Sequence, residues 1–158
     1  MIRTGALPED GVIARPLGKL TMVNCASPHY LTRFGYPQSP DDLTSHAIVR
    51  YTPHLGVHPF GFEVASVNGV QWFKSGGMLT VNSRENYLAA GLAGLGIIQI
   101  PRIAVREALR AGRLIEVLPG YRAEPLSLSL VYPQRRELSR RVNLFMQWLA
   151  GVMKEHLD

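Results

Sequence analysis

Short apolar runs rich in β-branched residues mark the first third of the chain. They predict β-strands at residues 12–15, 20–25 and 47–51. A turn is expected over residues 16–19, because Pro16 and Gly18 interrupt the apolar pattern there. The chain is therefore expected to start with β structure.

Two serine-proline pairs mark helix starts. Ser27 precedes Pro28, and Ser39 precedes Pro40. A serine oxygen can cap the free N–H groups of a first helical turn, and proline suits that turn because it lacks an N–H group. We expect one helix from Pro28 that ends at Gly35, and a second short helix after Ser39.

A β-hairpin is expected next. Residues 60–67 and 70–73 read as strands, and the Asn68-Gly69 pair between them is a strong signal for a tight two-residue turn.

The second half of the chain alternates between strand and helix patterns. Strands are expected at residues 77–81, 96–100, 114–118 and 126–132. Helices are expected from Ser83, from Pro101 with Ala104, Val105, Ala108 and Leu109 facing inward, and over residues 138–157. The terminal helix carries an apolar stripe of Val142, Phe145, Met146, Leu149, Val152 and Met153. Strand, helix and strand over residues 77–100 predict a βαβ unit, so the fold class is α/β.

Composition is that of an ordinary globular protein. Of the 158 residues, 46% are hydrophobic and 18% charged, and the net charge of +5 is spread along the chain. The single cysteine, Cys25, excludes an intrachain disulfide and is expected to be a small buried hydrophobe. Because neither an export signal nor a membrane-spanning run is visible, we expect a cytoplasmic protein without membrane contact.

Signals for metal, nucleotide or enzyme chemistry are weak. His54 and His58 have the spacing of a helical metal pair, but prolines deny them a helix and no third ligand stands nearby. Gly91, Gly94 and Gly96 follow the wrong order for a nucleotide loop, and we interpret them as a helix end before a tight strand entry. No nucleophile elbow is present. We therefore expect no cofactor, no metal and no catalytic residue.

Arginines form two runs. They are Arg102, Arg106, Arg110 and Arg113, and Arg135, Arg136, Arg140 and Arg141. We interpret both runs as solvated faces, because no helix-turn-helix or interleaved aromatic pattern accompanies them.

Two polar positions favour ligand binding. Asn82 and Ser83 lie where a strand ends and a helix begins, so free N–H groups and the helix dipole favour an anion there. Ser83 can equally be a simple cap. Gln99, the one amide in an aliphatic strand, either faces a polar cleft or is hydrogen-bonded within the fold.

Several strings along the chain together resemble one family. They are Arg3-Thr4-Gly5-x-Leu7-Pro8-Glu9-Asp10, Ala14-Arg15-Pro16-Leu17-Gly18, Cys25-Ala26-Ser27-Pro28-x-Tyr30-Leu31, Gly35-x-Pro37-x-x-Pro40-x-Asp42-Leu43-x-x-His46, Ala93-Gly94-Leu95-Gly96-Ile97, Gly112-x-Leu114 and Leu130-Val131-Tyr132-Pro133. In order and spacing they resemble the effector-binding domain of LysR-type transcription regulators.

The resemblance implies a type 2 periplasmic-binding-protein-like α/β fold with two lobes and a small effector in the cleft. Lobe two would be residues 22–125, nearly complete, and residues 1–21 with 126–158 would be a remnant of lobe one. The positions that match the family's effector contacts are Thr4, Gly5, Asn82, Ser83, Gln99 and Pro101.

The implied partners are a small-molecule effector, for which the helix start at Ser83 favours an anion, and further copies in a homo-oligomer. DNA would be bound only through a winged helix-turn-helix module that these 158 residues do not include. The alternatives are a free-standing two-lobed binding protein for a small carboxylate or amino acid, and an enzyme on a similar scaffold.

Overall fold

The computed structural model describes residues 1–5, 11–52, 61–133, 139–154 and 157. The chain forms two compact units. Unit 1 combines Met1–Thr21 with Pro125–Asp158, and unit 2 is the continuous segment Met22–Glu124. His54, His58, Arg135 and Arg136 lie outside the described residues. In the part described, no helix is long and apolar enough to cross a membrane.

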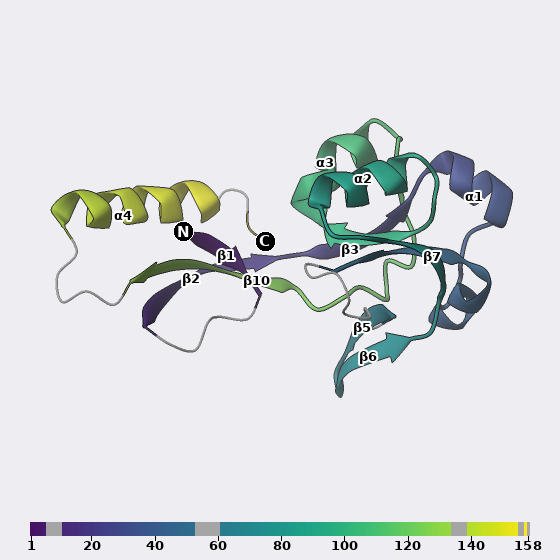
Figure 1. Cartoon of the computed structure of the whole chain (residues 1–158), viewed down its shortest axis with the longest axis horizontal. Coiled ribbons are helices and arrows are strands. Elements are labelled where there is room, and N and C mark those ends of the chain that lie inside the picture. The colour runs from purple at the N-terminus through teal and green to yellow at the C-terminus, as the bar shows by residue number, and fades with distance from the viewer. Residues whose placement is uncertain (6–10, 53–60, 134–138, 155–156, 158) are drawn as a thin grey trace. The chain divides into compact units, whose positions relative to one another are not determined.

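Unit 1 is built on a three-stranded antiparallel sheet with strand order β1-β10-β2. Its strands are β1 (Ile2–Thr4), β10 (Leu126–Pro133) and β2 (Val12–Leu20). The central strand β10 buries Leu128, Leu130 and Val131. Helix α4 (Arg140–Lys154) lies against β2 in this unit (Figure 1).

The turn expected over residues 16–19 is wrong, because these residues belong to strand β2. The strand runs unbroken through Pro16 and Gly18, and a shift in its register against β10 falls between Leu128 and Ser129. Proline is tolerated because β2 is an edge strand, where a missing N–H group need not break a ladder. The irregularity absorbs the extra residue, as a β-bulge does.

The stripe predicted for the terminal helix is only partly buried. The helix is present, but it is shorter than the expected range of residues 138–157. Met146 is buried, whereas Val142, Phe145 and Val152 are exposed. One side of α4 therefore remains apolar and open to solvent.

Unit 2 is built on a mixed sheet. Its strands are β3 (Met22–Ala26), β4 (Ala47–Tyr51), β7 (Gly76–Val81), β8 (Ile98–Pro101) and the short β9 (Ile115–Glu116). Strand β4 pairs in parallel with β7, and a parallel bridge from Ile48 to Ile97 joins β4 to the chain entering β8. Because β3 pairs antiparallel with both β8 and β9, the strand order is β7-β4-β8-β3-β9.

Helices start where the capping signals predict. Helix α1 (Pro28–Phe34) starts after Ser27, whose Oγ accepts from the Tyr30 N–H at 3.2 Å, and ends at Gly35. The segment after Ser39 is a short 3₁₀ helix, η1 (Pro40–Ser45). The last two helices of unit 2 are α2 (Arg84–Leu92) and α3 (Arg102–Arg110).

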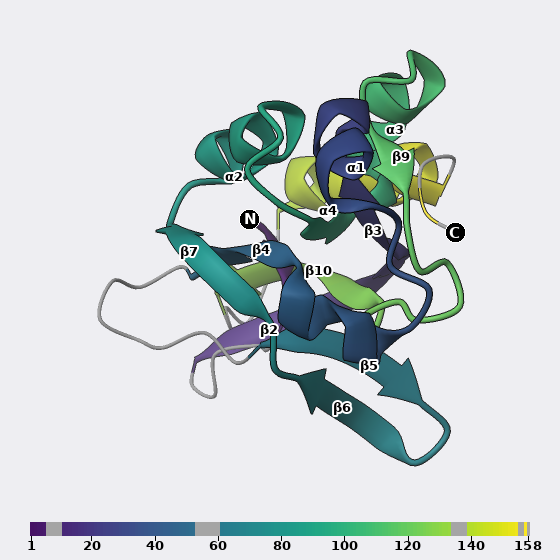
Figure 2. The same cartoon turned by 90° about the vertical axis from the view of Figure 1, so that its right-hand side faces the viewer.

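The predicted βαβ unit is confirmed. Strand β7 leads through α2 to β8, and β4 lies between the two parallel strands. Helices α2 and α3 cover one face of the sheet (Figure 2). They bury Tyr87, Ala90, Val105 and Ala108 against the strands, but Ala104, which we expected to face inward, is exposed.

The other face of the sheet carries the hairpin β5 (Phe62–Ser66) and β6 (Gly69–Phe73), as Figure 2 shows. The hairpin is confirmed, but its turn is shifted by one residue. Ser66 pairs with Gly69, so Val67 and Asn68 form the turn. Gly69 has φ +108°, whereas Asn68 is not among the described residues with positive φ, which the expected Asn-Gly turn would require.

Candidate functional site

Three parallel strand ends meet at one edge of unit 2. Tyr51 and Val81, the last residues of β4 and β7, are direct partners in the ladder. Strand β8 runs parallel to β4 and ends at Pro101. In α/β sheets ligands bind beyond the carboxyl ends of the strands, so this carboxyl edge is the natural place for a site.

Two helix N-termini lie at the same edge, because α2 follows β7 and α3 follows β8 directly. Asn82 is exposed, and Ser83 caps α2 by accepting from the Asn86 N–H at 3.1 Å. Pro101 occupies the capping position of α3. Each helix start presents free N–H groups and the positive end of its dipole, which attract negative charge.

A carboxylate already uses the start of α2. Hydrogen bonds from its own backbone N–H and from the Ser83 hydroxyl lower the pKa of the Glu85 side chain. The electrostatics of this helix start therefore favour an ionised carboxylate.

Thr52 is a further candidate site residue, which the sequence analysis did not name. It follows β4 directly, its side chain is buried, and its N–H donates to the Val81 carbonyl at 2.9 Å. That bond brings Thr52 beside Asn82. Its signal was available, because Thr52 is the first polar residue after the predicted strand at residues 47–51.

Gln99 is hydrogen-bonded within the fold, one of the two interpretations its position allowed. Its Oε1 accepts from the Glu63 N–H at 3.0 Å, and its Nε2 donates to the Glu63 carbonyl at 2.7 Å. The same Nε2 donates to Asn24 Oδ1 at 2.9 Å. The amide thus joins the central sheet to the β5–β6 hairpin.

Asn24 also escaped the sequence analysis. It is wholly buried on β3, and its Nδ2 donates to the carbonyls of Leu118 at 3.3 Å and Tyr121 at 2.8 Å. No local pattern signals this role, because its partners lie far along the chain.

Thr4 and Gly5 belong to unit 1, unlike the other four candidate residues. Thr4 ends β1, and Gly5 has φ +82° with its N–H donating to the Ser127 carbonyl at 3.0 Å. Within unit 2 the structure brings Asn82, Ser83 and Pro101 to one edge. Gln99 lies two residues inside it.

The glycine-rich segment ends a helix, as expected. Gly94 follows α2 with φ +78°. At Gly96, where φ is +158°, an added Cβ would lie 2.6 Å from the Ala47 carbonyl oxygen, so the strand entry requires glycine.

Within the residues that the structure describes, no three His, Cys, Asp or Glu side chains form a group that could hold a metal ion. The arginines of α3, Arg102, Arg106 and Arg110, are exposed, and Arg113 beyond its end is exposed as well.

Comparison with known proteins identifies the family of this chain. The model of the LysR substrate binding domain matches residues 1–154. The HTH-type transcriptional regulator YhjC of Escherichia coli is 97% identical over 158 residues, 100% of this chain and 53% of that protein. An HTH-type transcriptional repressor of Pseudomonas aeruginosa is 33% identical over 157 residues, 98% of this chain and 49% of that protein.

Among solved structures, the regulatory domain of CrgA, a LysR-type transcriptional regulator from Neisseria meningitidis, aligns with a TM-score of 0.79 at 26% identity. The alignment covers 95% of this chain and 72% of that one. This chain spans about half the length of the curated relatives that it matches. The match over residues 1–154 and the shared type 2 periplasmic-binding-protein-like fold confirm the resemblance seen in the sequence: the chain belongs to the LysR substrate binding domain family.

Proposed function

We propose that this chain is the part of a transcriptional regulator that senses a small-molecule effector, and that it catalyses no reaction. One observation carries the proposal. Three parallel strand ends and two helix N-termini meet at the carboxyl edge of unit 2, in a chain of the LysR substrate binding domain family. Such an edge binds small ligands in α/β folds.

In this proposal the effector lies against Asn82, Ser83 and Pro101, and Thr52 joins them at the end of β4. Residues 22–125 are proposed to be lobe two, and residues 1–21 with 126–158 part of lobe one. Thr4 and Gly5, in unit 1, are proposed as effector contacts on the family resemblance alone. Gln99 contributes by holding the hairpin and Asn24 in place.

The effector is proposed to be an anion, in particular a carboxylate. The supporting observation is the lowered pKa of Glu85, whose carboxylate accepts the same kind of hydrogen bonds that an effector carboxylate would use. An effector carboxylate would take the place of the Glu85 carboxylate at the start of α2.

The relatives are named as transcriptional regulators, which favours a sensor over a free-standing binding protein or an enzyme. DNA contact is proposed to belong to a separate module of the full-length regulator, which acts as a homo-oligomer in the cytoplasm. A gene segment upstream that encodes a winged helix would separate this proposal from the free-standing binding protein.

The test begins with native mass spectrometry of the purified chain, which identifies a retained small molecule. Calorimetry then measures its affinity for variants at the edge. Losing a hydrogen bond to a charged group costs about 1.5 to 3 kcal/mol, so Ser83→Ala is expected to weaken binding by roughly tenfold to a hundredfold. Ser83→Gly separates binding from helix stability, because glycine keeps most of the capping preference.

Ser27→Gly is the matched control. Ser27 caps α1 in the same unit, but it follows the end of β3 opposite to the end that pairs with Pro101. Its loss should leave the effector affinity unchanged. Unchanged affinity in both Ser83→Gly and Asn82→Ala would show that the effector binds elsewhere.

A further inference from the structure

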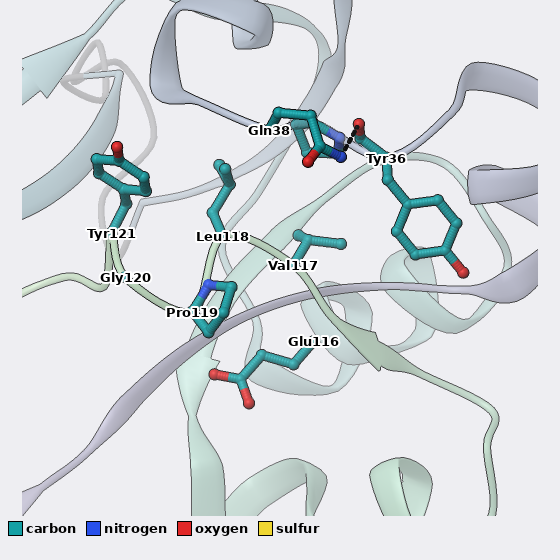
Figure 3. A pocket seen from close by; sticks show the side chains of 9 residues that line it. Tyr36, Gln38, Glu116, Val117, Leu118, Pro119, Gly120 and Tyr121 are labelled. Atoms are coloured by element: carbon teal, nitrogen blue, oxygen red, sulfur yellow. Dashed lines mark hydrogen bonds between the residues drawn. The ribbon is translucent and has the colours of Figure 1, made fainter.

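A second candidate site lies in unit 2, at the turn after β9. It is a cavity of about 220 Å³ between the segment after α1 and the turn that follows β9. The residues that matter here are Tyr36, Gln38, Glu116, Leu118, Pro119 and Tyr121 (Figure 3). Strand β9 is four strands away from β7 in the sheet order, which is about 19 Å at the usual strand spacing. The cavity therefore lies apart from Asn82 and Ser83, whereas Pro101 at the end of β8 is two strands from β9.

The wall of this cavity is held in an unfavourable backbone conformation. Leu118 has φ +48°, and it is the only residue other than glycine with positive φ in the described part of the chain. The Tyr121 N–H closes the turn on the Leu118 carbonyl at 2.9 Å, and buried Asn24 donates to both residues' carbonyls. Strain of this kind persists only where the surroundings impose it, and it gathers at ligand sites. The wall is thus formed before any ligand arrives.

The cavity offers one carboxylate, which is paired with Arg122, beside apolar residues. Val117, Leu118 and Pro119 are the apolar residues next to the cavity, the first two of them largely buried in the core of unit 2, and Glu116 is the only lining residue with a formal charge at neutral pH. Arg122 donates from both Nε and Nη2 to the same Glu116 oxygen, Oε1, at 3.0 and 2.5 Å. Among the described residues, Oε2 has no hydrogen-bond donor. The carboxylate can therefore accept one more.

Two tyrosines stand at the opening. The two rings lie on opposite sides of the cavity (Figure 3), and Tyr36 is 54% exposed and Tyr121 39% exposed, so a cation can reach either ring. The Gln38 amide donates to the Tyr36 carbonyl at 3.1 Å and holds that segment in place, as Figure 3 shows.

We propose that this cavity binds a small organic cation, a primary ammonium group on a short alkyl body. The ammonium donates to Glu116 Oε2, and the alkyl chain packs on Leu118 and Pro119. Binding there also reaches the central sheet, because Asn24 holds the turn with its Nδ2 and accepts from Gln99 with its Oδ1.

The test uses three probes of one shape and different charge: butylammonium, butanol and butyrate. The amide resonances of the ¹⁵N-labelled chain are followed by NMR during titration with each. Butylammonium should shift the amides of Leu118, Gly120 and Tyr121 and saturate in the millimolar range, as expected for so small a ligand. Butanol should bind at least about tenfold more weakly, and butyrate should produce no saturable shift there.

Glu116→Gln should weaken butylammonium binding by about tenfold or more, since a charged acceptor is lost. Glu124→Gln is the matched control, because it makes the same charge change at an exposed position outside the cavity and should leave binding unchanged. If Glu116→Gln does not fold, Tyr36→Ala replaces it, with an expected weakening of about two- to fivefold.

Three results would overturn the proposal. They are equal binding of butanol and butylammonium, shifts that map outside the turn after β9, and an affinity for butylammonium that Glu116→Gln leaves unchanged.

Discussion

A single buried amide, Asn24, holds together three segments of unit 2. It contacts the turn at Leu118 and Tyr121 and the strand residue Gln99, all of them distant in sequence. The sequence marks Gln99 as unusual, because an amide stands out in an aliphatic strand. It does not reveal Asn24, because only the pairing of Asn24 with Gln99 across β3 and β8 brings the two amides together.

Asn24→Ala is expected to destabilise the protein by about 2 to 4 kcal/mol. The change leaves the Tyr121 carbonyl and one Gln99 amide hydrogen without their partner, and the Leu118 carbonyl keeps only its bond from the Tyr121 N–H. Each unsatisfied group costs about 1 to 3 kcal/mol. Chemical denaturation measures the free energy of unfolding. Asn86→Ala, at an exposed position of α2, is the control and should stay within about 0.5 kcal/mol of the parent. A similarly small change for Asn24→Ala would contradict this role.

Cys25 is expected to be inert to thiol reagents in the folded protein. Burial, with a smaller contribution from the nearby Glu116 charge, raises the pKa of its thiol from 9.0 to about 12. At pH 8 the reactive thiolate is then about a thousandfold scarcer than in a free cysteine. A chromogenic disulfide reagent should react slowly with the native chain and rapidly in denaturant. Fast reaction without denaturant would show that unit 2 opens readily around β3.

At the scale of elements, local signals predicted where helices begin and tertiary context decided the rest. Ser27 and Ser83 cap helices as their sequences indicate, because a capping bond involves only neighbouring residues. The strand through Pro16 could not be predicted in this way, since proline is acceptable there only because β2 lies at the edge of its sheet. The candidate site residues also differ in how far the local sequence predicts them. Ser83 follows from local spacing. Thr52 stands out as the first polar residue after a predicted strand, but only the pairing of β4 with β7 shows that it lies beside Asn82.

The Asp42 carboxyl group at the start of η1 is expected to titrate below its ordinary pKa. The Asp42 carboxylate accepts from the N–H groups of Gln38 at 2.8 Å and Ser39 at 3.0 Å, and these bonds lower its pKa below the ordinary value of 3.8. A lowered carboxyl pKa stabilises the folded state above the ordinary pKa, and this contribution disappears as the pH falls through the folded value. NMR titration of the two amides should show a midpoint below pH 3.8.

Asp42→Asn serves as the control for that titration. The amide keeps an acceptor oxygen but carries no proton that titrates in this range, so the pH dependence of the Gln38 and Ser39 resonances should vanish. A midpoint at or above the ordinary carboxyl value in the parent chain would contradict the capping role.

At the scale of the whole chain, the exposed apolar side chains of α4 lead us to expect self-association. Its exposed apolar side chains are Val142, Leu144, Phe145, Trp148 and Val152. Monomeric soluble proteins rarely leave so contiguous an apolar surface open to water, and a second copy can cover it. Sedimentation velocity should show association that grows with concentration.

The double variant Phe145→Ser and Trp148→Gln should shift that equilibrium toward the monomer by roughly tenfold or more, because two large apolar surfaces are lost. Val67→Ser is the control, since Val67 is a fully exposed apolar residue on the hairpin turn of unit 2 and does not belong to α4. A parent chain that stays monomeric at every concentration would disprove self-association through this helix.

The division of the chain also fixes an order of events during synthesis. Unit 2 is continuous, whereas the central strand of unit 1, β10, is made after all of unit 2 and must pair with β1 and β2 from the other end of the chain. On the ribosome, unit 2 can therefore complete its sheet while β1 and β2 still lack their partner. Since domains fold as units while the chain emerges, β1 and β2 find their place in the sheet only after unit 2 has been made.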